Sequence, residues 1–207
     1  MSATLVQRVL MYLLAFVIAI TLHEFAHALS ADLLGDDGPK RAGRISLNPL
    51  DHLDPMGTLF LVVTAVLGYA FGWGRPVMVS SSRFKNPRVG DAIVSFAGPA
   101  TNLILAIVCA VIVRTGYFRL PNSSPWHEFI DVALNLNILL FVFNLVPVPP
   151  LDGSHILADI LPIDMAKSYQ GFMARYGFIM FFVIIYFGGM IVGPAMNQIH
   201  SFLVPGS

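Results

Sequence analysis

The stretch Ile20–Leu29, ITLHEFAHAL, ends an apolar run that begins near Leu5 and contains two histidines and a glutamate. His23 and His27 are four residues apart, so on a helix they project from one face about one turn apart. That spacing lets two imidazoles reach one cation, while Glu24 contacts a water at the metal without being a ligand itself. Zinc suits imidazoles combined with a carboxylate, so the stretch predicts part of a zinc site.

The composition indicates a membrane protein. The 207 residues are 56% hydrophobic and 12% charged, whereas soluble domains carry about 25% charged residues. In a soluble helix an H-E-x-x-H pattern often arises by chance. Within a membrane helix, however, each such polar side chain costs about 2–3 kcal/mol, so these three residues are expected to have a function. The net charge of zero gives no indication of nucleic-acid binding.

Apolar segments long enough to cross a bilayer as a helix recur along the chain. We expect an all-α polytopic membrane protein with a single domain over residues 1–207 and its core motifs within residues 20–160. The loop pieces AGRISLN (42–48) and RPVMVSS (75–81) alternate enough to predict short β-strands. The apolar segments cover residues 5–34, 56–72, 92–113, 129–146 and 177–192.

A third ligand is expected in FNLVPVPPLDGSH, residues 143–155. Its three prolines cannot continue a helix, so we expect extended backbone to deliver Asp152 at a turn. Asp152 would complete a His-His-Asp zinc site. The alternative, on this stretch alone, is that Asp152 caps the N-terminus of a helix that begins near Ser154.

Three motifs, in this order, resemble the site-2 protease family of intramembrane zinc metalloproteases: HEFAH (23–27), FAGPATN (96–102) and NLVPVPPLDG (144–153). The stretch RISLNPLDHLDPMGT (44–58) resembles the compact prokaryotic branch of that family, which lacks an added PDZ or CBS domain. The resemblance implies Zn²⁺ as cofactor and hydrolysis of peptide bonds within or near the transmembrane segments of membrane proteins.

Carried over to this sequence, the family pattern makes His23, His27 and Asp152 the zinc ligands. It makes Glu24 the general base and acid. Asn144 matches an asparagine that positions the substrate or polarises the scissile carbonyl.

Four other residues carry expectations of their own. His155 stands where the family often has arginine, and it is either a partner of Asp152 or an alternative ligand. Asn102 is expected to brace the motif helix by a hydrogen bond, and Gly98 to allow close helix contact. His52 lies in a turn-rich loop and is expected to be solvated or interfacial, with a gating role as the alternative.

The zinc ligands also constrain the topology. His23 lies towards the C-terminal end of the first apolar segment and Asp152 lies just beyond the fourth. These two segments must therefore run in the same direction, so one of the two segments between them does not cross. Segment 56–72 is short and glycine-bearing, and we expect it to be a re-entrant hairpin. Basic residues flank it on both sides, which predicts four spans with outside termini and an active site nearer the cytoplasmic face of the cell membrane.

The alternative function is a non-enzymatic metal-binding membrane transporter or a structural membrane protein, with polar residues spaced as a path across the bilayer. For a protease, the expected partners are the lipid bilayer and membrane-protein substrates with a transmembrane helix. Such a substrate must be unwound, and it could add to a strand edge at RPVMVSS or AGRISLN. Homo-oligomerisation stays open.

Overall fold

Long apolar helices form the body of the molecule. The structure, a computed structural model, describes residues 4–67, 71–115 and 125–205. The all-α prediction is confirmed for this part of the chain, in which four helices are long and apolar enough to cross a membrane. They are α1 (Leu5–Leu34), α4 (Pro87–Thr115), α5 (Pro125–Asn144) and α7 (Ile163–Ile191).

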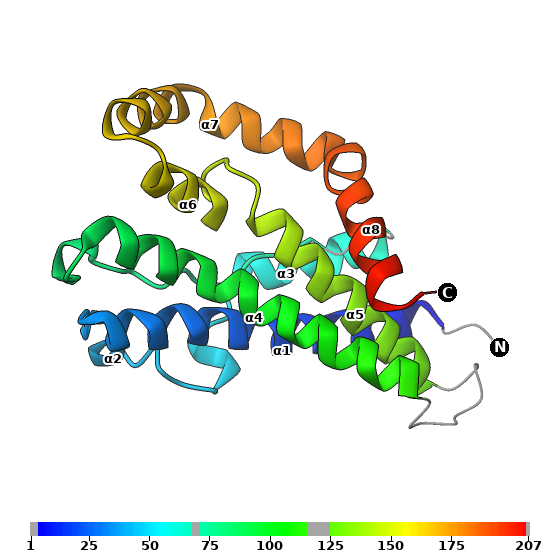
Figure 1. The fold of residues 1–207 in the computed structure, drawn as a ribbon. Helices are drawn as coiled ribbons and strands as arrows, with labels where there is room; N and C mark the ends of the chain where they lie inside the picture. Colours follow the sequence, from blue (N-terminus) through cyan, green and yellow to red (C-terminus); the bar gives the residue numbers. More distant parts are fainter. Residues whose placement is uncertain (1–3, 68–70, 116–124, 206–207) are drawn as a thin grey trace.

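Helices α1, α4 and α5 pack against one another. Helix α4 runs antiparallel to the other two, so α1 and α5 run in the same direction, as predicted (Figure 1). Small side chains such as Ala15 and Ala19 let these helices approach closely around Phe16, Leu61 and Leu136. The tight packing of these three helices fixes the positions along the bundle axis at which their polar side chains meet.

One shorter apolar helix, α3 (Pro55–Val66), lies between α1 and α4 in the chain. Its 12 residues extend about 18 Å, which is less than the ~30 Å hydrocarbon core of a bilayer. The second apolar segment therefore cannot cross as a helix. The predicted re-entrant hairpin over residues 56–72 is not supported, because this segment gives one helix and then a non-helical stretch from Phe71, with residues 68–70 outside the described part.

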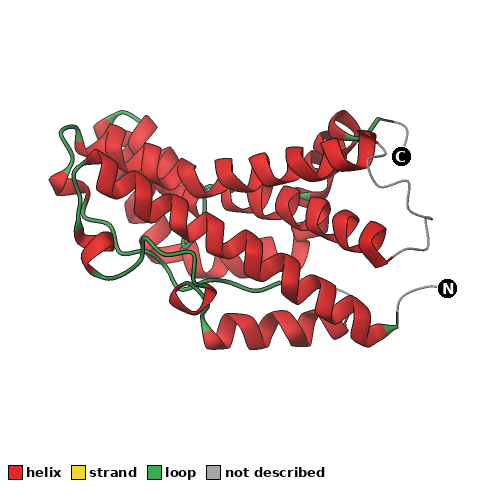
Figure 2. Cartoon of the chain, turned by 90° about the horizontal axis from the view of Figure 1, so that it is seen from below, coloured by secondary structure: helices red, strands yellow, loops and turns green. Residues whose placement is uncertain are grey.

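The prediction of short β-strands is wrong. Figure 2 shows helices joined by loops, and the described residues form only an isolated antiparallel bridge between Leu53 and Gly74. Side chains hold the loops instead. The buried Asp36 carboxylate, for example, accepts a hydrogen bond from the Ser80 N–H at 2.7 Å. A backbone N–H that is hydrogen-bonded to a side chain does not require a hydrogen-bond partner on a neighbouring strand.

After α5 the chain turns tightly, with the Leu151 N–H donating to the Val148 carbonyl at 3.0 Å, instead of running extended as predicted. It then enters the short helix α6 (Asp152–Ile160). Arg88 of α4 donates to the carbonyl of Ala158 at 3.0 Å and to that of Leu161, which ties the end of α6 to the start of α4.

Helix α7 packs chiefly against α6 and α8 (Gly193–Leu203), and α8 ends at the same end of the molecule at which α1 begins (Figure 1). The remaining elements are short and lie in the loops: α2 (Gly38–Arg41) and the 3₁₀ turns η1 (Pro49–Asp51) and η2 (Ser81–Arg83).

Candidate metal centre

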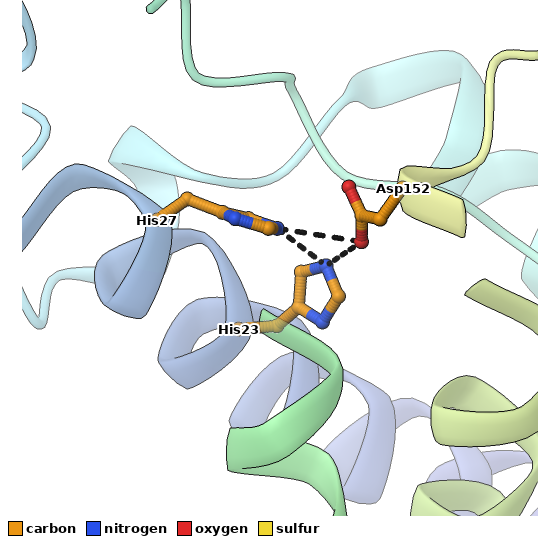
Figure 3. Close-up of side chains that lie close together, drawn as sticks. All are labelled: His23, His27 and Asp152. Carbon is orange, nitrogen blue, oxygen red and sulfur yellow. Dashed lines mark hydrogen bonds and ion pairs between the residues drawn. The ribbon is translucent and has the colours of Figure 1, made fainter. Parts of the chain in front are cut away.

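Three side chains from two helices converge at one point (Figure 3). His23 and His27 lie on the buried face of α1, and Asp152 is the first residue of α6. The two Nε2 atoms are 3.0 Å apart, and Asp152 Oδ2 lies 3.3 Å from His23 Nε2 and 3.5 Å from His27 Nε2. Within the described residues, this is the one group of three that could hold a metal ion.

The spacing of these atoms fits zinc. A tetrahedral Zn²⁺ with bonds of about 2.05 Å holds its ligand atoms about 3.3 Å apart, and the three distances here run from 3.0 to 3.5 Å. Asp152 Oδ2 is buried and accepts no hydrogen bond from the part of the chain that the structure describes. A cation bound between the three atoms would satisfy that orphaned acceptor.

The outer nitrogen of each imidazole is also held. His23 Nδ1 lies 2.6 Å from Asn102 Oδ1, and His27 Nδ1 lies 2.7 Å from the Val94 carbonyl oxygen. Both acceptors require an N–H at Nδ1, which leaves the Nε2 lone pairs for a metal. Asn102 in turn donates to Asn137 Oδ1 at 3.0 Å, so a buried polar chain joins α1, α4 and α5.

The hydrogen bond that Asn102 makes to His23 agrees with its predicted bracing role. Sequence reasoning missed Asn137, although an asparagine within an apolar segment was a signal that could have been followed.

Helix α4 approaches the two imidazoles at Gly98. A Cβ atom at this position would lie 2.3 Å from His27 Nε2 and 2.6 Å from His23 Nε2. Only glycine fits at such separations, so the predicted close helix contact is present and is made with the ligand side chains themselves.

Glu24 lies beside this group and is buried, at 7% exposure. Its Oε2 is 3.7 Å from Nη2 of Arg44, whose side chain is also buried. On the sequence alone, Arg44 served only as a marker of topology.

A cavity of about 610 Å³ opens at the candidate ligands and Glu24. Asn144 lines it, and its Nδ2 donates to the Leu140 carbonyl at 2.9 Å. Much of the remaining wall is apolar and includes Phe71, Phe143 and Phe181. The cavity is therefore suited to an apolar polypeptide segment that reaches a small polar centre.

One of the two alternatives for His155 is not supported, and the prediction for His52 needs correction. His155 is exposed, and its Nδ1 lies 3.4 Å from Asp91 Oδ2, so its role as an alternative ligand is not supported. His52 is not solvated but fully buried, and its Nε2 bonds to the Ser46 carbonyl at 2.7 Å. Its loop is paired with the segment that precedes α4, since the Arg75 N–H donates to the His52 carbonyl at 2.7 Å.

Comparison with known proteins agrees with this geometry. The chain is 38% identical over 199 residues to YwhC of Bacillus subtilis (strain 168), which is named a zinc metalloprotease, and the alignment covers 89% of this chain and 84% of YwhC. The sequence profile of peptidase family M50 matches residues 118–187. The chain belongs to peptidase family M50, the site-2 protease family.

Other relatives carry similar names within the M50 family. Rip2 of Mycolicibacterium smegmatis, named a zinc metalloprotease, is 30% identical over 183 residues, covering 88% of this chain and 67% of Rip2. Rip2 of Mycobacterium tuberculosis (strain H37Rv), named in the same way, is 27% identical over 188 residues, covering 90% of this chain and 68% of that protein. No solved structure matches the chain significantly.

Proposed function

We propose that this M50 peptidase hydrolyses peptide bonds within or near the transmembrane segments of membrane proteins, as a zinc enzyme, with residues 1–207 acting as one membrane-embedded domain. The observation that carries the proposal is the triangle of His23, His27 and Asp152, which has the dimensions of a tetrahedral zinc site and lies beside Glu24. The names of YwhC and Rip2 support the assignment.

His23, His27 and Asp152 would hold Zn²⁺. When bound, this ion would act as a Lewis acid that polarises the scissile carbonyl and lowers the pKa of a water molecule. Glu24 accepts a proton from the attacking water at a carboxylate oxygen as the water oxygen bonds to the carbonyl carbon. Glu24 then gives this proton to the amine nitrogen as the C–N bond breaks. Asn144, on the cavity wall, is suited to hold the substrate or to donate to the carbonyl oxygen.

The substrate has to be extended at the scissile bond, because a helix hides its carbonyls in its own hydrogen bonds. Residues 76–79 lie outside any helix and line the cavity, so they are placed to run beside an extended substrate. We expect Val77→Pro to slow cleavage without loss of zinc, whereas Val77→Ala retains the backbone N–H and cleaves normally. Equal rates for the two variants would remove this segment from substrate binding.

We assign the end of the bundle at which α1 finishes and α4 begins to the cytoplasmic face. Most of the basic residues of the chain lie at this end, and basic residues favour the cytoplasm. His23 and His27 lie in the half of α1 nearer this end. The basic residues at this end include Lys40, Arg41, Arg44, Arg75, Arg83 and Lys85 between α1 and α4, and Arg88 at the start of α4.

The buried polar side chains argue for an enzyme against a transporter. One buried polar side chain from each of α1, α4 and α5 is joined to the next by a hydrogen bond beside the candidate ligands, in the chain His23–Asn102–Asn137. A transporter would need such groups spaced along a path through the bilayer.

The direct test is cleavage by the purified full chain. Incubated in detergent with a panel of transmembrane-helix peptides, the wild-type protein should cleave some of them, and a zinc chelator should stop the reaction. Glu24→Gln should retain zinc and lose cleavage, because it keeps the ligands and removes the base. A Glu24→Gln variant that cleaves at the wild-type rate would overturn the proposal.

A further inference from the structure

We propose that Arg44 is a positioning residue that holds the carboxylate of Glu24 in the orientation needed for proton transfer. The inference rests on the proposed function, in which Glu24 is the base. Arg44 is not among the residues that line the cavity, so it acts through Glu24 and not on the substrate.

The ion pair between the two side chains is buried. Arg44 Nη2 lies 3.7 Å from Glu24 Oε2, and the two side chains are 9% and 10% exposed. Charges removed from water are screened little by salt, so this attraction acts on Glu24 more strongly than a surface pair would. The backbone also fixes the position of Arg44, since its N–H donates to the Pro39 carbonyl at 2.9 Å.

The same guanidinium nitrogen donates to the main-chain carbonyl of Arg75. Residue 75 directly precedes the cavity-lining residues 76–79, and its own N–H is bonded to the His52 carbonyl. Arg44 therefore joins the carboxylate of the base to the loop that forms one wall of the cavity. Burial lowers the pKa of Arg44 and Glu24 opposes the decrease, but an arginine stays charged in proteins.

The other oxygen of Glu24 is confined by Gly74. A Cβ at this glycine would lie 3.2 Å from Glu24 Oε1 and 2.7 Å from Ile20 Cγ1, so the backbone passes close to the carboxylate. Oε2 thus faces Arg44 and Oε1 faces Gly74. The backbone at Gly74 thus leaves little room beside Oε1, and Arg44 is the charged side chain that faces Oε2.

The choice of arginine follows from this double contact. Arg44 Nη2 makes both contacts. The rigid, planar guanidinium fixes the directions of its N–H bonds, whereas a lysine ammonium is a rotatable point charge on a flexible stem. A displacement of about 1 Å in a reacting group can cost about 100-fold in rate. Loss of Arg44 should therefore affect turnover while leaving the zinc ligands in place.

The test compares Arg44→Gln and Arg44→Lys with Arg41→Gln, which removes an exposed arginine paired with Asp37 on the surface. Arg44→Gln should bind one zinc per chain, keep KM within about 2-fold, and lose about 10- to 100-fold in kcat. Arg44→Lys should recover part of that loss, and Arg41→Gln should behave as the wild type. Wild-type kcat in Arg44→Gln, or a loss of zinc that parallels the loss of activity, would overturn the inference.

A second measurement needs no turnover. In the chelated protein, the unfolding midpoints of wild type, Glu24→Gln, Arg44→Gln and the double variant form a cycle that isolates the pair. The double variant should be destabilised by less than the sum of the single variants, because either one alone leaves a buried charge unpaired. Additive effects would overturn the inference, and Arg44→Met, which removes the charge and keeps the apolar stem, replaces Arg44→Gln in the cycle should the latter fail to fold. An inactive wild type with a coupled cycle would instead refute the proposed protease function.

Discussion

At the residue scale, the candidate centre depends on atoms that face away from the metal position. The spacing of HEFAH predicted two imidazoles on one helix face, and Asp152 was implied by the resemblance to site-2 proteases. The partners of these ligands were harder to predict, because Asn102 lies 79 residues from His23 in the chain. A local period predicts which side chains share a helix face, but not which distant residue will meet them.

We expect Asn102→Ala to weaken zinc binding by about 10- to 100-fold, because the Nδ1–H of His23 loses its acceptor and the ring loses its fixed orientation. Competition with a chelator of known affinity measures the change. The matched control is Asn135→Ala in α5. It removes an exposed asparagine whose side chain donates to the carbonyl of Asp131, one turn earlier in that helix. Equal zinc affinities in the two variants would contradict the role given to Asn102.

Gly98→Ala should remove most of the bound zinc, since its Cβ would come within 2.3 Å of His27 Nε2 and force the ligand or α4 to move. The control is Gly188→Ala in α7, where a Cβ meets nothing within 4 Å. Zinc content per chain, with helicity checked by circular dichroism, separates the outcomes. A zinc-replete Gly98→Ala variant would show that α4 does not approach the imidazoles as closely as described.

At the scale of the elements, the four long apolar helices were predictable and the loops were not, although α7 begins at Ile163 and the predicted segment began at residue 177. The first apolar segment was predicted from residue 5 to residue 34, and α1 spans Leu5–Leu34. The loop pieces AGRISLN and RPVMVSS alternate like strands, yet buried charged side chains hold their backbones. Asp36 reaches Ser80 across 44 residues, and Arg44 reaches Arg75 across 31. The alternation of apolar and polar residues indicates an extended backbone, but it does not reveal which groups form hydrogen bonds with that backbone.

Asp36→Asn should destabilise the protein by about 2 kcal/mol, because a buried carboxylate that accepts from two backbone N–H groups and a guanidinium is replaced by a neutral amide. The partners are the N–H groups of Ser80 and Gly38 and the side chain of Arg83. Asp37→Asn is the matched control, since Asp37 is exposed and its pairs with Arg41 and Arg83 should contribute less than about 1 kcal/mol. Equal unfolding midpoints for the two variants would contradict this.

The same site gives a pH dependence. Burial alone would raise the pKa of Asp36, but the two N–H groups and Arg83 lower it below its ordinary value. Its stabilisation is therefore fully present above the unfolded-state pKa of about 4 and is lost as the pH falls through the lower folded-state pKa. The difference in stability between wild type and Asp36→Asn should shrink over that acidic range.

At the scale of the whole molecule, the position of the metal centre and the basic loops lead to one topology. Helices α1 and α5 run in the same direction and deliver His23 and Asp152 to one level, while α3 is too short to cross. The expected direction of the helices followed from the sequence because His23 and Asp152, as ligands of one metal, must lie at one level. The conformation of segment 56–72 did not follow, since periodicity does not reveal where a short helix ends.

Cysteine labelling tests this topology. In a Cys109→Ala background, Ser201→Cys should react with a membrane-impermeant maleimide in intact bacterial cells, because α8 ends at the end of the bundle that we assign to the outside. Ser82→Cys should react only after the membrane is opened, since its loop lies at the end that we assign to the cytoplasm. Both serines are exposed, so burial does not confound the comparison. The reverse pattern would contradict the assigned orientation.

X-ray absorption at the zinc edge of the purified full chain tests the central claim most directly. We expect one zinc per chain with two imidazole nitrogens and carboxylate oxygen at about 2.0–2.2 Å, and loss of that oxygen shell or of the metal in Asp152→Ala. Absence of zinc from the wild-type protein, or a zinc shell that Asp152→Ala leaves unchanged, would contradict the joint binding of one cation by α1 and α6.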